Sequence, residues 1–210
     1  VAAHVVEMLG KLGYGKNLSA LRRGYEYIRS EQEPDGPWFG RWGVNYIYGT
    51  GAVLPALEAI GEDMSQPYVR QSVDWIVAHQ NPDGGWGESC GSYVDAAFKG
   101  VGPSTASQTA WALLALLAAG QGGHPATEGG VRYLMDTQLE DGSWDEPYFT
   151  GTGFPGYGIG QRPDRLPRPG EAGYQGLEMP AGFMINYHMY RNLWPLTALG
   201  RYQRLFGLTQ

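Results

Sequence analysis

The 210-residue sequence lacks the features that mark several classes of protein. Cys90 is its single cysteine, which excludes an internal disulfide framework. No apolar run reaches the roughly 18 residues that a membrane-spanning helix requires, so we expect no transmembrane helix in this sequence. Lys and Arg number 15 against 21 Asp and Glu, giving a net charge of -6, and they form no basic stripe. Nucleic acid is therefore not expected as a partner.

Strict alternation of apolar and polar residues, which marks a half-buried β-strand, is also scarce. Residues 44–48 alternate only briefly and continue into a helical pattern, so there is no good strand candidate. Apolar residues recur at helical spacing instead. The predicted helices cover residues 1–13, 18–31, 46–60, 67–80, 104–119, 126–138 and 183–205. The sequence therefore predicts an all-α chain.

One turn occurs three times, at residues 32–38 (QEPDGPW), 80–86 (QNPDGGW) and 138–144 (QLEDGSW). Each has Gln first, Asp at +3, Gly at +4 and Trp at +6, and a period of roughly fifty residues indicates a repeat architecture. A Gln side chain both donates and accepts hydrogen bonds, so it can bond backbone groups left over at helix ends. We expect a structural role, joining neighbouring helices, for Gln32, Trp38, Gln80, Trp86, Gln138 and Trp144.

The predicted helices alternate in character. Those that run into the three turns carry Arg and acidic residues on one face, whereas 46–60 and 104–119 are rich in Ala, Leu and Gly, as buried helices are. Residues 104–108 (STASQ) supply an N-terminal cap for the apolar run that follows. Inner helix, outer helix and turn in repetition predict an α/α toroid, a partial α/α barrel.

Residues 155–182 break this pattern because prolines alternate with glycines there, so no regular element is expected. We expect a long Gly/Pro-rich loop inserted into the domain.

Aromatic residues gather at three places. Trp42 and Tyr48 lie in one short aromatic segment, and Phe154 lies in residues 150–155 (TGTGFP). Phe183, Tyr187 and Tyr190 are spaced i, i+4 and i+7, which places them on one face of the predicted helix 183–205. Such a set is ordinary core, or it is the wall of a cavity in which π faces stabilise a cation without offering a nucleophile. Spacing leaves both interpretations open.

Polar candidates carry weaker signals. His4 stands on an otherwise apolar helix start and is either a core histidine or the partner of a carboxylic acid. Glu88 and the Asp145–Glu146 pair suggest a glycosidase pair only weakly, because no second acid stands at a defined spacing. Cys90 with His79 and Asp83 or Asp95 forms a loose set without zinc-ligand spacing, so no metal site is expected.

Several long motifs resemble squalene–hopene cyclases. They are residues 38–50 (WFGRWGVNYIYGT), 80–90 (QNPDGGWGESC), 104–112 (STASQTAWA), 144–155 (WDEPYFTGTGFP), 187–191 (YHMYR) and 195–202 (PLTALGRY). The resemblance spans nearly the whole chain and corresponds to roughly the C-terminal third of such an enzyme. We therefore expect residues 1–210 to be a C-terminal fragment, part of one α/α-barrel cyclase domain.

The resemblance implies a bacterial class II triterpene cyclase, which protonates a terminal alkene of squalene and closes rings through successive carbocations. Loss of a proton or addition of water then gives hopene or hopanol. It implies no cofactor and no metal. It also implies two α/α-barrel domains, monotopic association of the full-length protein with the cytoplasmic membrane, and in many members a homodimer.

Residue by residue, the resemblance assigns His4 as the hydrogen-bond partner of the catalytic acid. It assigns Trp42, Tyr48, Phe154, Phe183, Tyr187 and Tyr190 to the cavity that binds squalene and stabilises the cations. Two features depart from the family pattern. The Asp-rich motif that supplies the proton is absent from this sequence, so the fragment alone is expected to be inactive, and the 155–182 loop is an insertion.

Two other functions remain as alternatives. A protein prenyltransferase β-subunit shares the toroid but requires an Asp/Cys/His zinc site. A non-catalytic binding module would use the toroid as a scaffold. A hydrophobic cavity lined by Trp42, Phe154 and Phe183 favours the cyclase, whereas a polar, water-filled centre favours the others.

Overall fold

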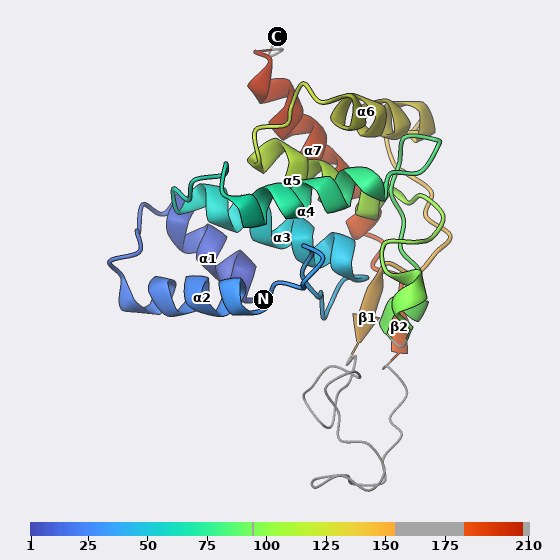
Figure 1. Ribbon diagram of the computed structural model, residues 1–210. Helices are drawn as coiled ribbons and strands as arrows, with labels where there is room; N and C mark the ends of the chain where they lie inside the picture. Colours follow the sequence, from blue (N-terminus) through green and yellow to red (C-terminus); the bar gives the residue numbers. More distant parts are fainter. Residues whose placement is uncertain (94, 154–182, 208–210) are drawn as a thin grey trace, which may run out of the picture.

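A computed structural model describes residues 1–93, 95–153 and 183–207 of the chain, and Figure 1 shows its elements in order. The α-helices of the described residues are α1 (Ala2–Lys11), α2 (Ser19–Ser30), α3 (Tyr46–Ala59), α4 (Pro67–Ala78), α5 (Ala106–Ala118), α6 (Pro125–Thr137) and α7 (Tyr190–Leu205). Two short 3₁₀ turns, η1 (Cys90–Tyr93) and η2 (Ala96–Phe98), join α4 to α5. The prediction of an all-α chain is confirmed in its main elements.

Helices α3 and α5 lie at the centre of the molecule. Almost every residue of both is buried, as expected for helices that are apolar on all sides. Gly51 lets the two helices approach closely, because a Cβ there would lie 2.6 Å from the carbonyl oxygen of Trp111. The side chain of Thr105 accepts a hydrogen bond from the Gln108 N–H at the start of α5, which confirms the predicted N-terminal cap.

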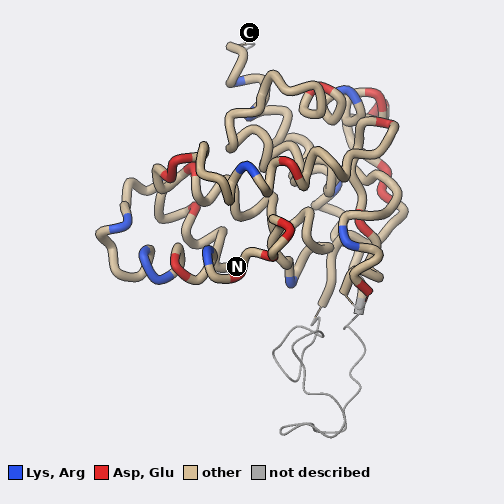
Figure 2. Tube along the Cα trace, in the orientation of Figure 1, with Lys and Arg blue, Asp and Glu red and all other residues tan. Residues whose placement is uncertain are grey.

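Helices α2, α4 and α6 form the outer layer, and Figure 2 shows charged residues along them and in the loops. Helix α2 buries only Leu21 and Ile28 and turns its charged residues outward, as an amphipathic surface helix does. The alternation of inner and outer helices along the chain is the α/α arrangement that the repeats predicted.

Helices α1 and α7 flank the two central helices and also contact each other. Arg201 of α7 donates a hydrogen bond of 2.8 Å to Glu7 of α1. The rings of His4 and Trp194 stack with centroids 6.1 Å apart. The four inner helices therefore share one core, although α1 and α7 lie at opposite ends of the sequence.

The three repeated turns have equivalent structures. Each Trp indole N–H donates to the carbonyl ten residues earlier, and each Gln amide donates to the turn glycine carbonyl four residues later. The Trp bonds run to Ile28, Ile76 and Leu134 at 2.7, 2.7 and 2.8 Å. The Gln bonds run to Gly36, Gly84 and Gly142 at 2.8, 2.8 and 2.9 Å. The repeat prediction is confirmed.

In two of these turns the glutamine also reaches the next outer helix. Gln32 donates to the carbonyl of Tyr68 in α4 at 2.9 Å, and Gln80 donates to that of Ala126 in α6 at 2.8 Å. Each bond satisfies an amide of one repeat with a carbonyl of the next. The turns thus join the outer helices in sequence.

The C-terminal part of the prediction is wrong in one respect. Helix α7 begins at Tyr190, and residues Phe183–Ile185 form strand β2, which pairs antiparallel with β1 (Gly151–Gly153). Phe183 is paired with Gly153, so Phe183, Tyr187 and Tyr190 do not share a helix face. Residues 155–182 and Phe154 lie outside the described residues, and the division into domains stays a prediction.

Residues 183–185 form a strand because they have a backbone partner, β1, that a local sequence pattern does not reveal. Strand β1 is itself held against the loop before α3, because the Thr152 N–H donates to the Trp42 carbonyl at 3.1 Å and the Val44 N–H to the Thr150 carbonyl at 2.9 Å. Residues 183–185 extend this small ladder. Strand pairing therefore satisfies backbone groups that a helix would otherwise pair within itself.

Candidate functional site

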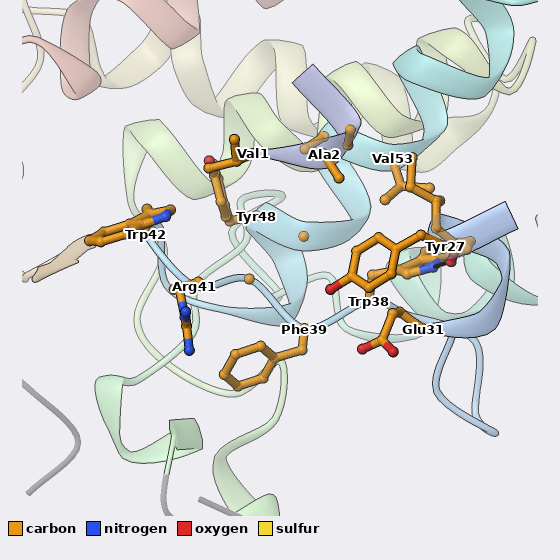
Figure 3. Close-up of a pocket in the computed structure, with 15 residues that line it drawn as sticks. Val1, Ala2, Tyr27, Glu31, Trp38, Phe39, Arg41, Trp42, Tyr48 and Val53 are labelled. Carbon is orange, nitrogen blue, oxygen red and sulfur yellow. Dashed lines mark hydrogen bonds between the residues drawn. The ribbon is translucent and has the colours of Figure 1, made fainter. Parts of the chain in front are cut away.

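A pocket of about 650 Å³ opens between the start of α1, the end of α2, and α3 with the loop that precedes it (Figure 3). This volume lies within the range of small-molecule sites. Trp42 and Tyr48 lie toward one end of the pocket, and Tyr27, Glu31 and Trp38 toward the other. Its further lining residues are Val1, Ala2, Ala3, Ile28, Phe39, Gly40, Arg41, Gly49, Ala52 and Val53.

Trp42 stands in a loop that several contacts hold in place. Its carbonyl accepts a hydrogen bond from Thr152 of β1. The hydroxyl of buried Tyr93 lies 2.8 Å from the carbonyl oxygens of both Gly40 and Gly43, on either side of Trp42. Trp42 is thus a half-buried side chain on a firmly attached backbone.

Tyr48 lies in the first turn of α3, with its ring against the loop glycines. A Cβ at Gly40 or Gly43 would lie 2.6 or 2.5 Å from that ring, so only glycine fits at either position. The Tyr48 hydroxyl lies 3.1 Å from Nε2 of His4. Burial lowers the pKa of His4 and raises the pKa of Tyr48, so at neutral pH the two groups form an uncharged hydrogen-bonded pair.

Aromatic rings continue from this pair toward α7. Trp111 of α5 packs edge-on against Tyr48 and Tyr190, with centroids 4.9 and 5.7 Å apart. Trp194 lies 6.1 Å from the rings of both Trp111 and His4. We call His4, Tyr48, Trp111, Tyr190 and Trp194 the aromatic cluster. Tyr48 also lines the pocket and so belongs to both.

Comparison with known proteins shows the family of this chain. The sequence model described as the squalene-hopene cyclase C-terminal domain matches residues 1–159. The chain belongs to the squalene–hopene cyclase family. It is 50% identical over 204 residues to the squalene–hopene cyclase of Alicyclobacillus acidocaldarius, covering 97% of this chain and 28% of that protein.

Two further relatives show the breadth of the family. The squalene–hopene cyclase of Bradyrhizobium diazoefficiens is 44% identical over 209 residues, covering 98% of this chain and 28% of that protein. The dammaradiene synthase of Dryopteris crassirhizoma is 40% identical over 226 residues, covering 97% of this chain and 29% of that protein. The chain thus spans a little over a quarter of the length of these relatives.

The structure brings together some of the candidate site residues that the sequence selected. His4, Tyr48 and Tyr190 lie in the aromatic cluster, and Tyr187 extends it, with its ring centroid 4.7 Å from that of Tyr190. Trp42 lines the pocket beside Tyr48. Phe183 is described only by its place in β2, and Phe154 lies outside the described residues.

Trp111 and Trp194 of the cluster were missed by the sequence analysis. Trp111 lies in an apolar helix whose side chains are nearly all buried, so the sequence pattern does not distinguish it from ordinary core residues. Trp194 follows Tyr190 by four residues, and that spacing is the signal that could have selected it.

Glu88 and Glu146, which were considered with Asp145 for a glycosidase pair, cap inner helices of this chain. Glu88 accepts hydrogen bonds from the Asn45 and Ile47 N–H groups at the start of α3, at 3.1 and 2.9 Å. Glu146 accepts from the Ser107 N–H at the start of α5, at 2.8 Å. Each glutamate follows its turn Trp by two residues, and burial raises the pKa of both. Their geometry is that of structural caps.

The zinc set considered from sequence is likewise not assembled. Across residues 1–93, 95–153 and 183–207, no three His, Cys, Asp or Glu side chains gather in a way that would hold a metal ion. Cys90 donates a long hydrogen bond to the Phe149 carbonyl, at 3.4 Å. His79 directly follows α4 and bonds the Trp75 carbonyl of that helix.

None of the helices in the described part of the chain combines the length and the apolarity needed to cross a bilayer.

Proposed function

We propose that this chain is the part of a squalene–hopene cyclase that supplies the histidine partner of the acid and one aromatic wall of the reaction cavity. The parent enzyme converts squalene to hopene and hopanol through a cascade of carbocations started by protonation. The observation that carries this proposal is the His4–Tyr48 hydrogen bond, which lies within the aromatic cluster at the residue that also lines the pocket. The relatives, which are squalene–hopene cyclases, support the same substrate.

The first step requires a proton donor. We assign it to the Asp-rich motif that the family resemblance implies and that these 210 residues do not contain. When Tyr48 donates to Nε2 of His4, the neutral imidazole carries its proton on Nδ1, which is then a donor for the acid. A donor aimed at a carboxyl group stabilises the carboxylate left after proton transfer. His4 and Tyr48 then form a path by which a proton returns to the acid.

The later steps require stabilisation of positive charge without capture. The π faces of Trp42, Tyr48 and Tyr190 attract cations, by about 2 kcal/mol for a desolvated contact. None of these rings offers a strong nucleophile, so the carbocation persists until the next ring closes. This chemistry needs neither a metal nor an organic cofactor, and we propose none.

The same features weigh against the alternatives. A prenyltransferase β-subunit needs a zinc site, and the comparisons give cyclases. A binding module needs no uncharged His–Tyr pair beside an aromatic wall. We therefore retain the cyclase as the proposed function.

Squalene is a hydrocarbon that partitions into bilayers, so an enzyme that takes it up has to reach the membrane. We propose that the full-length protein lies monotopically on the bacterial cytoplasmic membrane and forms a homodimer. Helix α7 exposes apolar side chains, including Leu193, Leu196 and Leu205. Such a surface is consistent with α7 being covered in the full-length protein.

The test is His4→Ala in the full-length enzyme. Loss of a general acid–base partner is expected to lower turnover about 100-fold or more, while squalene binding and the melting temperature change little. Turnover is measured by gas chromatography of the products. Unchanged turnover would make His4 a core histidine and overturn its assignment.

A further inference from the structure

Tyr93 connects the two ends of the loop that carries Trp42. It closes the η1 turn, is 3% exposed, and places its hydroxyl oxygen 2.8 Å from the carbonyl oxygens of Gly40 and Gly43. A tyrosine hydroxyl has one proton, so that proton is shared between two acceptors. The two carbonyls flank Arg41 and Trp42, both of which line the pocket. The hydroxyl therefore fixes the loop on both sides of the tryptophan.

The same two glycines are contacted from another direction by Tyr48. Its ring leaves no room for a Cβ at Gly40 or at Gly43. The loop is thus in contact with Tyr48 at its α-carbons and with Tyr93 at its carbonyls. A displacement of the loop away from Tyr93 would change the position of Trp42 relative to Tyr48, because these contacts are close.

The surroundings of Tyr93 make its hydroxyl hard to replace. The ring packs edge-on against Phe39, with centroids 5.6 Å apart, and the side chain is almost fully buried. If the hydroxyl were removed, water would have little access to the two carbonyls. Buried carbonyls without a donor are unfavourable, so the loop would move toward other donors or toward solvent.

We propose that Tyr93 is a positioning residue that fixes Trp42 at the pocket wall and thereby governs how far the cyclisation proceeds. The proposal rests on the proposed function, because it requires that Trp42 stabilises a cation of the cascade. Tyr93 itself does not line the pocket, so it acts through the loop.

The experiment compares product distributions of full-length variants by gas chromatography after incubation with squalene. Tyr93→Phe removes the hydroxyl and keeps the ring. It is expected to raise the fraction of partly cyclised products several-fold, with less than a tenfold loss in squalene consumption. Tyr133→Phe, at a half-buried tyrosine of the outer helix α6, is the matched control and should leave the products unchanged.

Trp42→Ala and the double variant Trp42→Ala/Tyr93→Phe separate this proposal from the proposed function. If Tyr93 acts through Trp42, the double variant gives the product pattern of Trp42→Ala alone, because coupled residues are not additive. If Trp42→Ala leaves the products unchanged, the cavity assignment in the proposed function fails. If Trp42→Ala changes them and Tyr93→Phe does not, the positioning role of Tyr93 fails.

A second variant covers the case in which Tyr93→Phe does not fold. Gly43→Ala displaces the same loop from the side of Tyr48 while the Tyr93 hydroxyl stays in place. It is expected to release the same partly cyclised products. A normal product pattern from Gly43→Ala would show that the loop position does not determine the outcome, and would overturn the proposal.

Discussion

The Nε2 atom of His4 lies 3.1 Å from the hydroxyl oxygen of Tyr48, so a hydrogen bond joins α1 to the first turn of α3. The contact spans 44 residues of sequence and lies within the aromatic cluster, at the one of its residues, Tyr48, that also lines the pocket. Because burial keeps both groups uncharged at neutral pH, the pair places no fixed charge in this apolar environment.

Substitution at a turn tryptophan should affect stability and leave the chemistry intact. Trp86 is fully buried and its indole N–H donates to the Ile76 carbonyl. Trp86→Ala is expected to lower the free energy of unfolding by about 3–5 kcal/mol, as large-to-small core substitutions do. Denaturant unfolding measures the loss. In the full-length enzyme the product spectrum should stay normal, and an altered spectrum would mean that Trp86 shapes the cavity.

The glutamines of two turns should differ in their contribution to the stability of this chain. Half-buried Gln80 bonds both its own turn and α6, whereas exposed Gln138 bonds its own turn at Gly142. Since one net hydrogen bond contributes about 0.5–1.5 kcal/mol, Gln80→Ala should destabilise by about that much more than Gln138→Ala. Thermal unfolding of both variants measures this difference in destabilisation. Equal losses would contradict the role of the contact between repeats.

The buried cap at Glu88 should make stability depend on pH. Burial raises its folded pKa above the usual value of 4.5, so between these two values the folded state binds more protons than the unfolded state. The contribution of this group to stability therefore falls as pH rises from 4.5 through the folded pKa. Glu88→Gln removes the titration.

The measurement for Glu88 is the free energy of unfolding of the parent chain and the variant across this pH range. The free energy of unfolding of the parent chain should fall relative to that of Glu88→Gln as pH rises. A constant difference would show that Glu88 titrates normally. Asp95→Asn provides the control, since Asp95 caps only the short η2 turn and is exposed.

Loss of a ring in the aromatic cluster should interrupt the cascade after protonation. Tyr190 packs against Trp111 and Tyr187, and Tyr190→Ala in the full-length enzyme is expected to increase the share of partly cyclised products. A lost contact of about 2 kcal/mol slows one step more than tenfold. Tyr202→Ala, on the same helix but packed against Phe206, should leave the products unchanged. Slower formation of normal product alone would assign Tyr190 to the core.

The chain of 210 residues should associate in solution. Large apolar side chains such as Met8, Leu12, Met135 and Leu196 are exposed, and extensive exposed apolar surface drives association. We expect oligomers by light scattering and binding of a hydrophobic dye. A monomer at high concentration that binds no dye would contradict this prediction.

Features that depend on a few neighbouring residues were predictable from the sequence. Apolar spacing gave the helices, and the Gln-to-Trp signature gave three equivalent turns, since hydrogen bonds such as that from Gln80 to Gly84 lie within one turn. Trp42 and Tyr48 were selected from one short segment and do line the same pocket. The residues of the candidate site could be named in part, but not their contacts.

What the sequence determined by itself is the all-α repeat with its inner and outer helices, because periodicity and turn chemistry act within about ten residues. The tertiary structure decided that residues 183–185 are a strand, since their partner β1 lies some thirty residues earlier. It also decided that Glu88 caps α3, that Tyr93 reaches Gly40 and that His4 meets Tyr48. Each of these contacts joins residues more than forty positions apart. Only the packing of α1, α3 and α5 brings such distant groups within hydrogen-bond distance.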